Sequence, residues 1–256
     1  MTPQPGNISD YCVTTETQRL FVLIYGQPVT GKSTGARTFP DPYVIDVENN
    51  LPGNVKNVVP LWSDAFVDKF QPRKNPAFPA DRRMLLATKI MPDFARKLTN
   101  KQTLVVDSLT RLETWYNLQE EAEPKPLGRD NKVDGNALWR QRLVYFDNLL
   151  TTLSGSQCNV VFTSHLQFER DEKREVTQYV RPALMGQIGE KLPGYFPICL
   201  QAVRDHIDLN TGKAHPNAPL VYAWRIKASV FAPARVPKLT DREYIKQDYN
   251  ELMKYV

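Results

Sequence analysis

The residues best suited to chemistry are Gly26 to Ser33, which read GQPVTGKS. Two glycines followed by lysine and serine at this spacing form a phosphate-binding loop, in which the glycines turn the chain tightly and backbone N–H groups point at phosphates. Lys32 is expected to reach the outer phosphates, and the Ser33 hydroxyl to bind Mg²⁺. The apolar run from Leu20 to Tyr25 supplies the preceding strand, and the helix that follows favours anions at its N-terminus.

The loop therefore predicts ATP, together with Mg²⁺, as the ligand. A glycine-rich turn that binds nothing is the alternative, and the apolar strand before the loop argues against it. The residues expected to contact the nucleotide are Gly26, Gln27, Pro28, Val29, Thr30, Gly31, Lys32, Ser33 and Thr34.

Acidic residues at two strand ends are further candidates, because parallel strands end at one edge of the sheet, beside the phosphates. Asp107 follows TLVV and is expected to hold Mg²⁺ with Ser33; its alternative role is to cap the helix from Leu109. Glu48 follows PYVIDV and is predicted to orient the attacking water, the alternative being a surface acid. Asp46, on the same face of that strand, is less well placed and is interpreted as a buried or edge acid.

One histidine and three cations complete the candidate set. His165 ends the run NVVFTS, where a polar side chain can contact the γ-phosphate and signal its loss, although a solitary histidine also serves structural roles. Arg225, Lys227 and Arg235 lie near the last strand. One of them could reach a nucleotide in a neighbouring subunit, the alternative being solvated surface charges.

Short β-rich runs alternate with helical patterns along the chain, which predicts a three-layer α/β fold with a mostly parallel central sheet. The segment from Trp62 to Ala80 is interpreted as a surface connection, and Pro92 is expected to kink or split the helix in which it lies. Asn136 is expected to cap a helix. Strands are expected at 20–25, 42–47, 103–106, 159–164, 196–203 and 220–228, and helices at 81–98, 109–121, 136–154 and 241–255.

Composition favours a cytoplasmic globular protein. The 256 residues are enough for one large domain, and the three cysteines show no disulfide or zinc pattern. No stretch is apolar for long enough to span a membrane, and residues 1–20 lack the features of a signal peptide. The net charge of +5 mildly favours a polyanionic partner. The expected organisation is an N-terminal arm at 1–19 and one domain at 20–256.

The order LFVLIYGQPVTGKST, YVIDVEN, TLVVDSL, NVVFTSH and GEKLPGYFPICLQAV, between Leu20 and Lys238, resembles phage-type AAA/RecA-like P-loop ATPases associated with recombination and single-strand annealing. The resemblance implies a RecA-like core without an accessory DNA-binding domain, and an oligomer that is a ring or a filament. It implies Lys32 and Ser33 on the phosphates and Mg²⁺, Glu48 as catalytic glutamate, Asp107 as the Walker B acid, and His165 in place of the usual glutamine sensor. Only Lys227 stands where such proteins often place two basic residues facing the next subunit's ATP.

RecA-like proteins face DNA with two loops, and the segments in matching order are 123–135 and 167–185. Their basic residues can contact phosphates, and nearby acids leave a solvated charged hairpin as the alternative. The candidate DNA contacts are Lys125, Arg129, Lys132, Arg170, Lys173, Arg174 and Arg181. A third basic stretch, 222–246, contains Trp224 and Phe231, which are both expected in the core.

The predicted function is a Mg²⁺-dependent ATPase that oligomerises on single-stranded DNA and promotes annealing or strand exchange in phage recombination, in the host cytoplasm. A single-strand DNA-binding protein is a further candidate partner. Two alternatives remain open: a nucleotide-gated ATPase that loads a replicative helicase, and a P-loop kinase with an arginine-bearing lid at 167–181.

Overall fold

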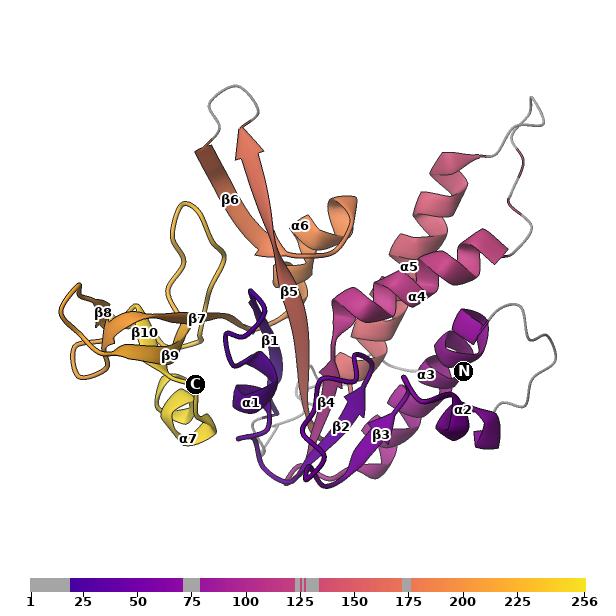
Figure 1. The fold of residues 1–256 in the computed structure, drawn as a ribbon, viewed down its shortest axis with the longest axis horizontal. Coiled ribbons are helices and arrows are strands. Elements are labelled where there is room, and N and C mark those ends of the chain that lie inside the picture. Colours follow the sequence, from indigo (N-terminus) through magenta and orange to yellow (C-terminus); the bar gives the residue numbers. More distant parts are fainter. Residues whose placement is uncertain (1–18, 71–78, 123–124, 126, 128–133, 172–175) are drawn as a thin grey trace, which may run out of the picture.

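The structure, a computed structural model, describes residues 19–70, 79–122, 125, 127, 134–171 and 176–256. A mostly parallel sheet lies between two helical layers (Figure 1). The three-layer α/β fold predicted from the sequence is therefore confirmed. The expected arm at 1–19 lies, except for Arg19, outside the described residues.

The central strand is β1 (Phe21–Gly26), which lies between two parallel neighbours, β5 (Asn159–Asp171) and β7 (Ile198–Asp208). On the β5 side follow β4 (Thr103–Asp107), β2 (Pro42–Asp46) and β3 (Val58–Pro60), all parallel. On the β7 side, β9 (Leu220–Arg225) and β10 (Tyr244–Lys246) continue the sheet in antiparallel pairing, and β8 (Lys213–Ala214) pairs with β7. The order is β10-β9-β7-β1-β5-β4-β2-β3.

Both faces of β1 are buried, which is why its sequence is apolar without alternation. Phe21, Leu23 and Tyr25 point into one hydrophobic cluster, while Val22 and Ile24 point into another. Helices therefore cover both faces of the sheet.

The larger cluster is packed by α3 (Pro79–Lys97), α4 (Leu109–Ala122), α5 (Gly135–Ser154) and α6 (Gly186–Tyr195). The smaller one contains residues of α1 (Lys32–Ala36) and α7 (Tyr249–Leu252), together with the buried rings of Phe39 and Trp224. A 3₁₀ turn, Met253–Tyr255, ends the chain. Trp224 is in the core as expected, whereas the expectation for Phe231 is wrong because its side chain is 54% exposed.

The segment at 62–80, expected as a surface connection, contains a helix in its described part, and residues 71–78 lie outside the described residues. The helix α2 (Asp64–Phe70) begins after Ser63, whose backbone and side-chain oxygens accept from the N–H of Phe66. Phe66 packs against the larger core cluster, and Val67 is fully buried in it. This packing stabilises a short helix that the local sequence does not reveal.

Pro92 does not split α3, which runs unbroken from Pro79 to Lys97. Proline removes one helical hydrogen bond, but its fixed φ is compatible with a helix. Met84, Met91 and Ala95 are buried on one face of α3, and this packing maintains the helix across the proline.

The charged segment at 167–181 matches the hairpin alternative in its described residues, 167–171 and 176–181. There β5 pairs antiparallel with β6 (Val176–Pro182), and the pair extends beyond the sheet (Figure 1). The helix expected at 241–255 is replaced by β10 and two short helical turns. Pairing with β9 buries Ile245, a tertiary gain that local helix propensity does not reveal.

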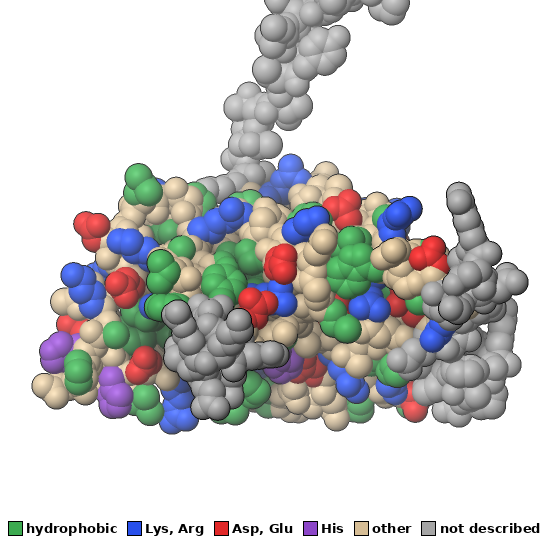
Figure 2. Space-filling model, turned by 90° about the horizontal axis from the view of Figure 1, so that it is seen from above, with side chains coloured by type: hydrophobic (Ala, Val, Ile, Leu, Met, Phe, Trp, Pro, Cys, Tyr) green, Lys and Arg blue, Asp and Glu red, His purple; other side chains and the backbone are tan. Residues whose placement is uncertain are grey.

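Charged side chains of both signs are interspersed on the face seen from above, with hydrophobic side chains among them (Figure 2). The described part of this face therefore presents mixed charge rather than one basic surface. None of the helices in the described part of the chain combines the length and apolar character needed to cross a bilayer.

The cap of α5 is Asp134 and not Asn136. The Asp134 carboxylate accepts from the backbone N–H groups of Asn136 and Ala137 at 3.0 and 3.1 Å.

Asp134→Ala should lower the free energy of unfolding by about 1 kcal/mol in urea denaturation. Asn136→Ala serves as the matched control and should change it by under about 0.5 kcal/mol, because only its backbone takes part in the cap. Equal losses in both variants would contradict this assignment.

Candidate nucleotide-binding and catalytic site

The phosphate-binding loop connects β1 to α1 and is held tightly in the structure. Lys32 is only 8% exposed, and its Nζ donates to the carbonyl oxygens of Gly26 and Gln27 at 3.0 and 2.8 Å. Burial lowers the pKa of Lys32, and the nearby carboxylates of Asp107 and Glu48 oppose that shift. The loop thus presents a buried ammonium group at the carboxyl edge of the sheet.

Two glycines of the loop are required by their surroundings. A Cβ on Gly26 would lie 2.5 Å from the carbonyl oxygen of Ala202 on the adjacent strand. Gly31 has φ +83°, in the left-handed region, and a Cβ there would lie 2.4 Å from Oε1 of Gln247. The two glycines of the motif are therefore needed for different reasons: Gly26 for the close approach of the neighbouring backbone, and Gly31 for its left-handed conformation.

Asp107 ends β4 and is 3% exposed. Its carboxylate accepts hydrogen bonds from the hydroxyls of Thr163 and Ser33. Burial raises the pKa of Asp107, and these two hydrogen bonds oppose the rise. The capping alternative does not apply, because the N–H of Arg111 in the first turn of α4 donates to Ser108.

Ser33 and Asp107 together fit a magnesium ion. The contact between them places a hydroxyl and a carboxylate oxygen side by side, and Mg²⁺ prefers oxygen ligands while keeping several waters. In the described part of the chain, no group of three or more His, Cys, Asp or Glu side chains has metal-binding geometry, so a dedicated all-protein metal cage is absent there.

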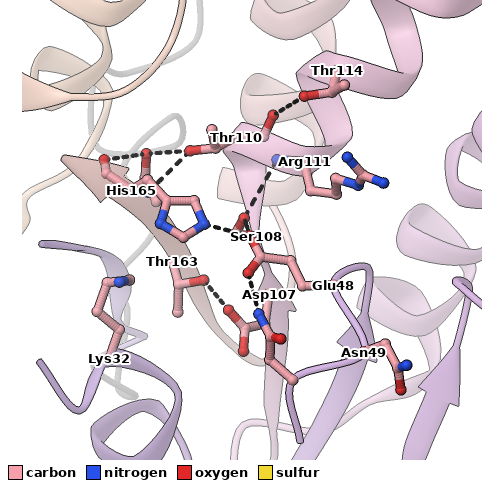
Figure 3. Close-up of polar contacts among 12 residues, drawn as sticks. Lys32, Glu48, Asn49, Asp107, Ser108, Thr110, Arg111, Thr114, Thr163 and His165 are labelled. Carbon is pink, nitrogen blue, oxygen red and sulfur yellow. Dashed lines mark hydrogen bonds and ion pairs between the residues drawn. The ribbon is translucent and has the colours of Figure 1, made fainter. Parts of the chain in front are cut away.

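Glu48 lies two residues beyond the end of β2, with its carboxylate held from three sides (Figure 3). Oε1 accepts from the Ser108 hydroxyl and lies 2.9 Å from Nε2 of His165, and Oε2 accepts from Asn50 at 2.7 Å. Burial raises the pKa of Glu48, but the hydrogen bonds from His165 and Ser108 outweigh it and place the pKa below its usual value. Glu48 is therefore held as a carboxylate.

Asp46 builds the turn that positions Glu48. Its Oδ1 accepts from the N–H groups of Glu48 and Asn49 at 3.1 and 2.9 Å, and Oδ2 accepts from Trp62 Nε1 at 2.9 Å. Burial raises the pKa of Asp46, and these hydrogen bonds oppose the rise. Asn49 has φ +61°, so the chain leaves the sheet sharply here. Of the two roles expected from the sequence, a buried or an edge acid, Asp46 has the first.

The register of the sheet places His165 between the loop and the two acids. The strand β5 pairs with β1 on one side and with β4 on the other. In the register of the β1–β5 pair, His165 lies opposite Gly26. Its backbone N–H donates to the Thr110 hydroxyl at 2.9 Å, and its ring contacts Glu48 (Figure 3). The four strands β1, β5, β4 and β2 thus bring Lys32, His165, Asp107 and Glu48 to one edge.

A family model described as an AAA domain matches residues 18–225 of the chain. The chain belongs to the AAA domain family. The match covers the phosphate-binding loop, Glu48, Asp107 and His165, so the AAA part of the AAA/RecA-like prediction is confirmed. A search of curated protein sequences finds no significant match.

The solved structures that match this chain are distant in sequence. The assembled ATPase EscN in complex with its stalk EscO, from the enteropathogenic E. coli type III secretion system, is 15% identical, with a TM-score of 0.41 over 73% of this chain. The RadB recombinase is 13% identical, with a TM-score of 0.37 over 90% of this chain and 91% of its own. A prototypical type III secretion ATPase of pathogenic bacteria is 16% identical, with a TM-score of 0.38 over 72% of this chain and 52% of its own. The chain spans 42% of the EscN chain.

The three C-terminal cations are held in different ways. Lys227 is exposed, and the Arg225 guanidinium lies 5.2 Å from the ring centre of Tyr244. Arg235 is also exposed, but it donates to the carbonyl oxygens of Pro193 and Phe196 at the end of α6, at 2.9 and 2.8 Å, so it has a structural role in this chain.

The candidate DNA contacts are only partly described. Lys125 is exposed, and Arg170 belongs to β5. Arg181 is 7% exposed and forms ion pairs with Glu169 at 2.8 Å and Glu190 at 3.3 Å, so these two acids compete with the predicted phosphate contact. Outside the described residues lie Arg129, Lys132, Lys173 and Arg174.

The sequence analysis missed two hydroxyls of the site. Thr163 donates to Asp107, and Thr110 accepts from the backbone N–H of His165. Thr163 precedes His165 by two residues, so both lie on one face of β5, and this period of two was the available signal. Which group each hydroxyl meets depends on the sheet register, which the sequence does not specify. Ser108, the residue after Asp107, donates to Glu48.

Thr163→Val should lower the free energy of unfolding by roughly 1–3 kcal/mol, because the buried Asp107 loses a hydrogen-bond donor. Urea denaturation at neutral pH measures the loss. Thr163→Ser retains the hydroxyl and should stay within about 1 kcal/mol of the wild type. Equal stability of the valine variant and the wild type would show that this hydroxyl does not stabilise Asp107.

Proposed function

We propose that the protein hydrolyses ATP with Mg²⁺ at the edge formed by β1, β5, β4 and β2. The observation that carries the proposal is the convergence of Lys32, the Ser33–Asp107 pair and the Glu48–His165 pair. These are a phosphate ligand, a magnesium ligand pair and a carboxylate able to orient water, which together suffice for phosphoryl transfer to water. The AAA domain family supports this chemistry.

Each residue has one task in this mechanism. Lys32 exchanges its hydrogen bonds to the loop carbonyls for the β- and γ-phosphate oxygens. Ser33 and Asp107 would hold Mg²⁺, which would supply charge neutralisation at the phosphates. Glu48, kept ionised by its hydrogen bonds, accepts a proton from the attacking water. His165 contacts both Glu48 and the start of the β5–β6 hairpin, so loss of the γ-phosphate can alter the hairpin.

Glu48→Gln should reduce ATP turnover by about 10²–10⁴-fold while ATP still binds, because the amide cannot accept the proton. Lys32→Ala should instead abolish ATP binding, since it removes the ligand of the outer phosphates. Phosphate release and isothermal titration calorimetry measure the two effects separately. Wild-type turnover in Glu48→Gln would refute the catalytic assignment.

A second candidate, phosphoryl transfer to a small acceptor, is favoured by a cavity of about 520 Å³ next to Glu48 and His165. Arg83 and Arg111 line it and offer charge to an anionic acceptor. The turnover assay separates the two functions when ADP and free phosphate are measured together. Equal amounts indicate hydrolysis, and ADP in excess in the presence of nucleosides or nucleotides indicates transfer.

We further propose that the protein oligomerises on single-stranded DNA and promotes annealing or strand exchange during phage recombination. The net charge of +5 and the basic residues in the sequence of the segment 167–185 support a polyanionic partner. The β5–β6 pairing starts at Leu166, directly after His165, so the hairpin is the element through which nucleotide state would reach DNA. Loading of a replicative helicase is the alternative task for the same ATPase, and exposed Lys227 is the proposed contact to a neighbouring subunit's nucleotide.

The double substitution Lys173→Glu and Arg174→Glu should weaken single-stranded DNA binding at least tenfold and reduce its salt dependence, because fewer phosphate contacts release counterions. Fluorescence anisotropy with a labelled oligonucleotide at several salt concentrations measures both effects. Basal ATP turnover should stay within twofold. Unchanged affinity and salt dependence would remove the hairpin from the DNA interface.

A further inference from the structure

The order of the strands sets the direction in which a bound nucleotide runs. Glu48 and His165, which mark the γ-phosphate end, belong to the β5–β4–β2 side of β1. The strands β7, β9 and β10 lie on the opposite side of β1. A triphosphate that crosses the loop from its γ end to its α end therefore delivers the nucleoside towards β9 and β10.

Three cavities border this path. The cavity of about 520 Å³ contains Glu48 and His165 in its wall and so lies at the γ end. A second cavity, of about 380 Å³, lies between the first half of the loop and the hairpin residues Leu166 and Phe168, directly after His165. The third, of about 690 Å³, touches Gly31 and Thr34 at the second half of the loop and has neither Glu48 nor His165 in its wall.

The lining of the third cavity suits a nucleobase in both size and chemistry. Apolar side chains from three segments form much of its wall, and small-molecule sites of about 300–1,000 Å³ are mostly apolar with a few polar groups. Leu220 and Tyr222 lie two residues apart on β9, hence on one face, and are 49% and 44% exposed. The remaining apolar residues of the wall are Val29, Leu209 and Val221.

Tyr222 lies against the loop itself. A Cβ on Gly31 would come within 3.3 Å of its Cδ1, so the ring starts where the phosphates end. The guanidinium of Arg204, opposite Tyr222 on β7, lies 5.4 Å from the ring centre and supports it by a cation–π contact. The exposed aromatic surface beside the loop can therefore stack a base.

Gln247 fixes this wall to the loop. Its Nε2 donates to the carbonyl oxygens of Thr30 at 2.8 Å and Ala223 at 2.9 Å, so both amide hydrogens are used. Thr30 belongs to the loop and Ala223 is next to Tyr222 on β9. The phosphate-binding loop and the aromatic wall thus form one continuous surface, positioned by a single side chain.

From this arrangement we propose that the third cavity is the nucleobase subsite of the bound nucleotide, with Tyr222 as the residue on which a purine stacks. The subsite rests on the proposed function, because its ligand is the nucleoside part of the ATP held by Lys32. Leu220 contacts the far edge of the base, and Gln247 holds Tyr222 in register with the loop. The first cavity, at the γ end, stays free for water or an acceptor. The second, between the loop, the hairpin and β7, stays free for the response of the hairpin.

The test compares ATP with tripolyphosphate, which carries the phosphates without a base, by isothermal titration calorimetry in Mg²⁺. Tyr222→Ala should weaken ATP binding about tenfold or more and leave tripolyphosphate binding within twofold. Tyr222→Phe retains the ring and should bind ATP as the wild type does. Phe168→Ala is the matched control, since it removes an exposed aromatic side chain from the second cavity, and it should leave both affinities within twofold.

Leu220→Ala, at a second exposed position of the same wall, should also weaken ATP selectively and provides an independent variant if Tyr222→Ala does not fold. Wild-type ATP affinity in Tyr222→Ala and Leu220→Ala would overturn the subsite, as would selective ATP loss in Phe168→Ala. Equal loss of ATP and tripolyphosphate in Tyr222→Ala would also overturn it, because the ring would then act on the phosphates. If the wild type binds neither ligand, the proposed function itself fails.

Discussion

The parallel pairing of β1 with β5, of β5 with β4 and of β4 with β2 is the constraint on which the rest of this structure depends. Parallel strands that share a register end at one edge, and there the chain leaves the apolar layers and can carry polar groups. The hydrogen-bond ladder thereby sets the separation of the catalytic side chains. A register shift of one residue would turn Thr163 and His165 to the opposite face of β5.

This edge holds ionisable groups that are expensive to bury, and each is compensated by a specific partner. Lys32 uses loop carbonyls, Asp107 uses two hydroxyls, and Glu48 uses His165, Ser108 and Asn50. A buried charge without such partners would be destabilising by several kcal/mol or would neutralise. Because the partners come from different strands, the site forms only when the whole sheet has formed, which couples its chemistry to tertiary folding.

The antiparallel extension formed by β9 and β10 lies on the other side of the loop from the acids. The parallel strands carry the groups proposed to act on the γ-phosphate, while the extension and the residue after it supply Tyr222 and Gln247 beside the loop's other end. The β5–β6 hairpin, which continues directly from His165, is the third element at this edge. The proposed catalytic groups, the proposed nucleobase subsite and a projecting hairpin thus meet around the five residues of backbone between β1 and α1.

The sequence by itself determined the phosphate-binding loop, the strand that ends at Asp107, the strand that contains His165, the position of Glu48 after its strand and the three-layer class, because each rests on residues close together in the chain. The continuation of β5 to Asp171 depends on its pairing with β6. Only the tertiary structure decided the Glu48–His165 contact, the β10 pairing that replaced a predicted helix, and the burial of Arg181 between two acids. The polar contacts among these features join residues that are not neighbours in the sequence. Arg181 and Glu190 are 9 residues apart, and His165 and Glu48 are 117 residues apart. Local propensity and periodicity carry no information about partners at such separations, whereas burial and strand register select them.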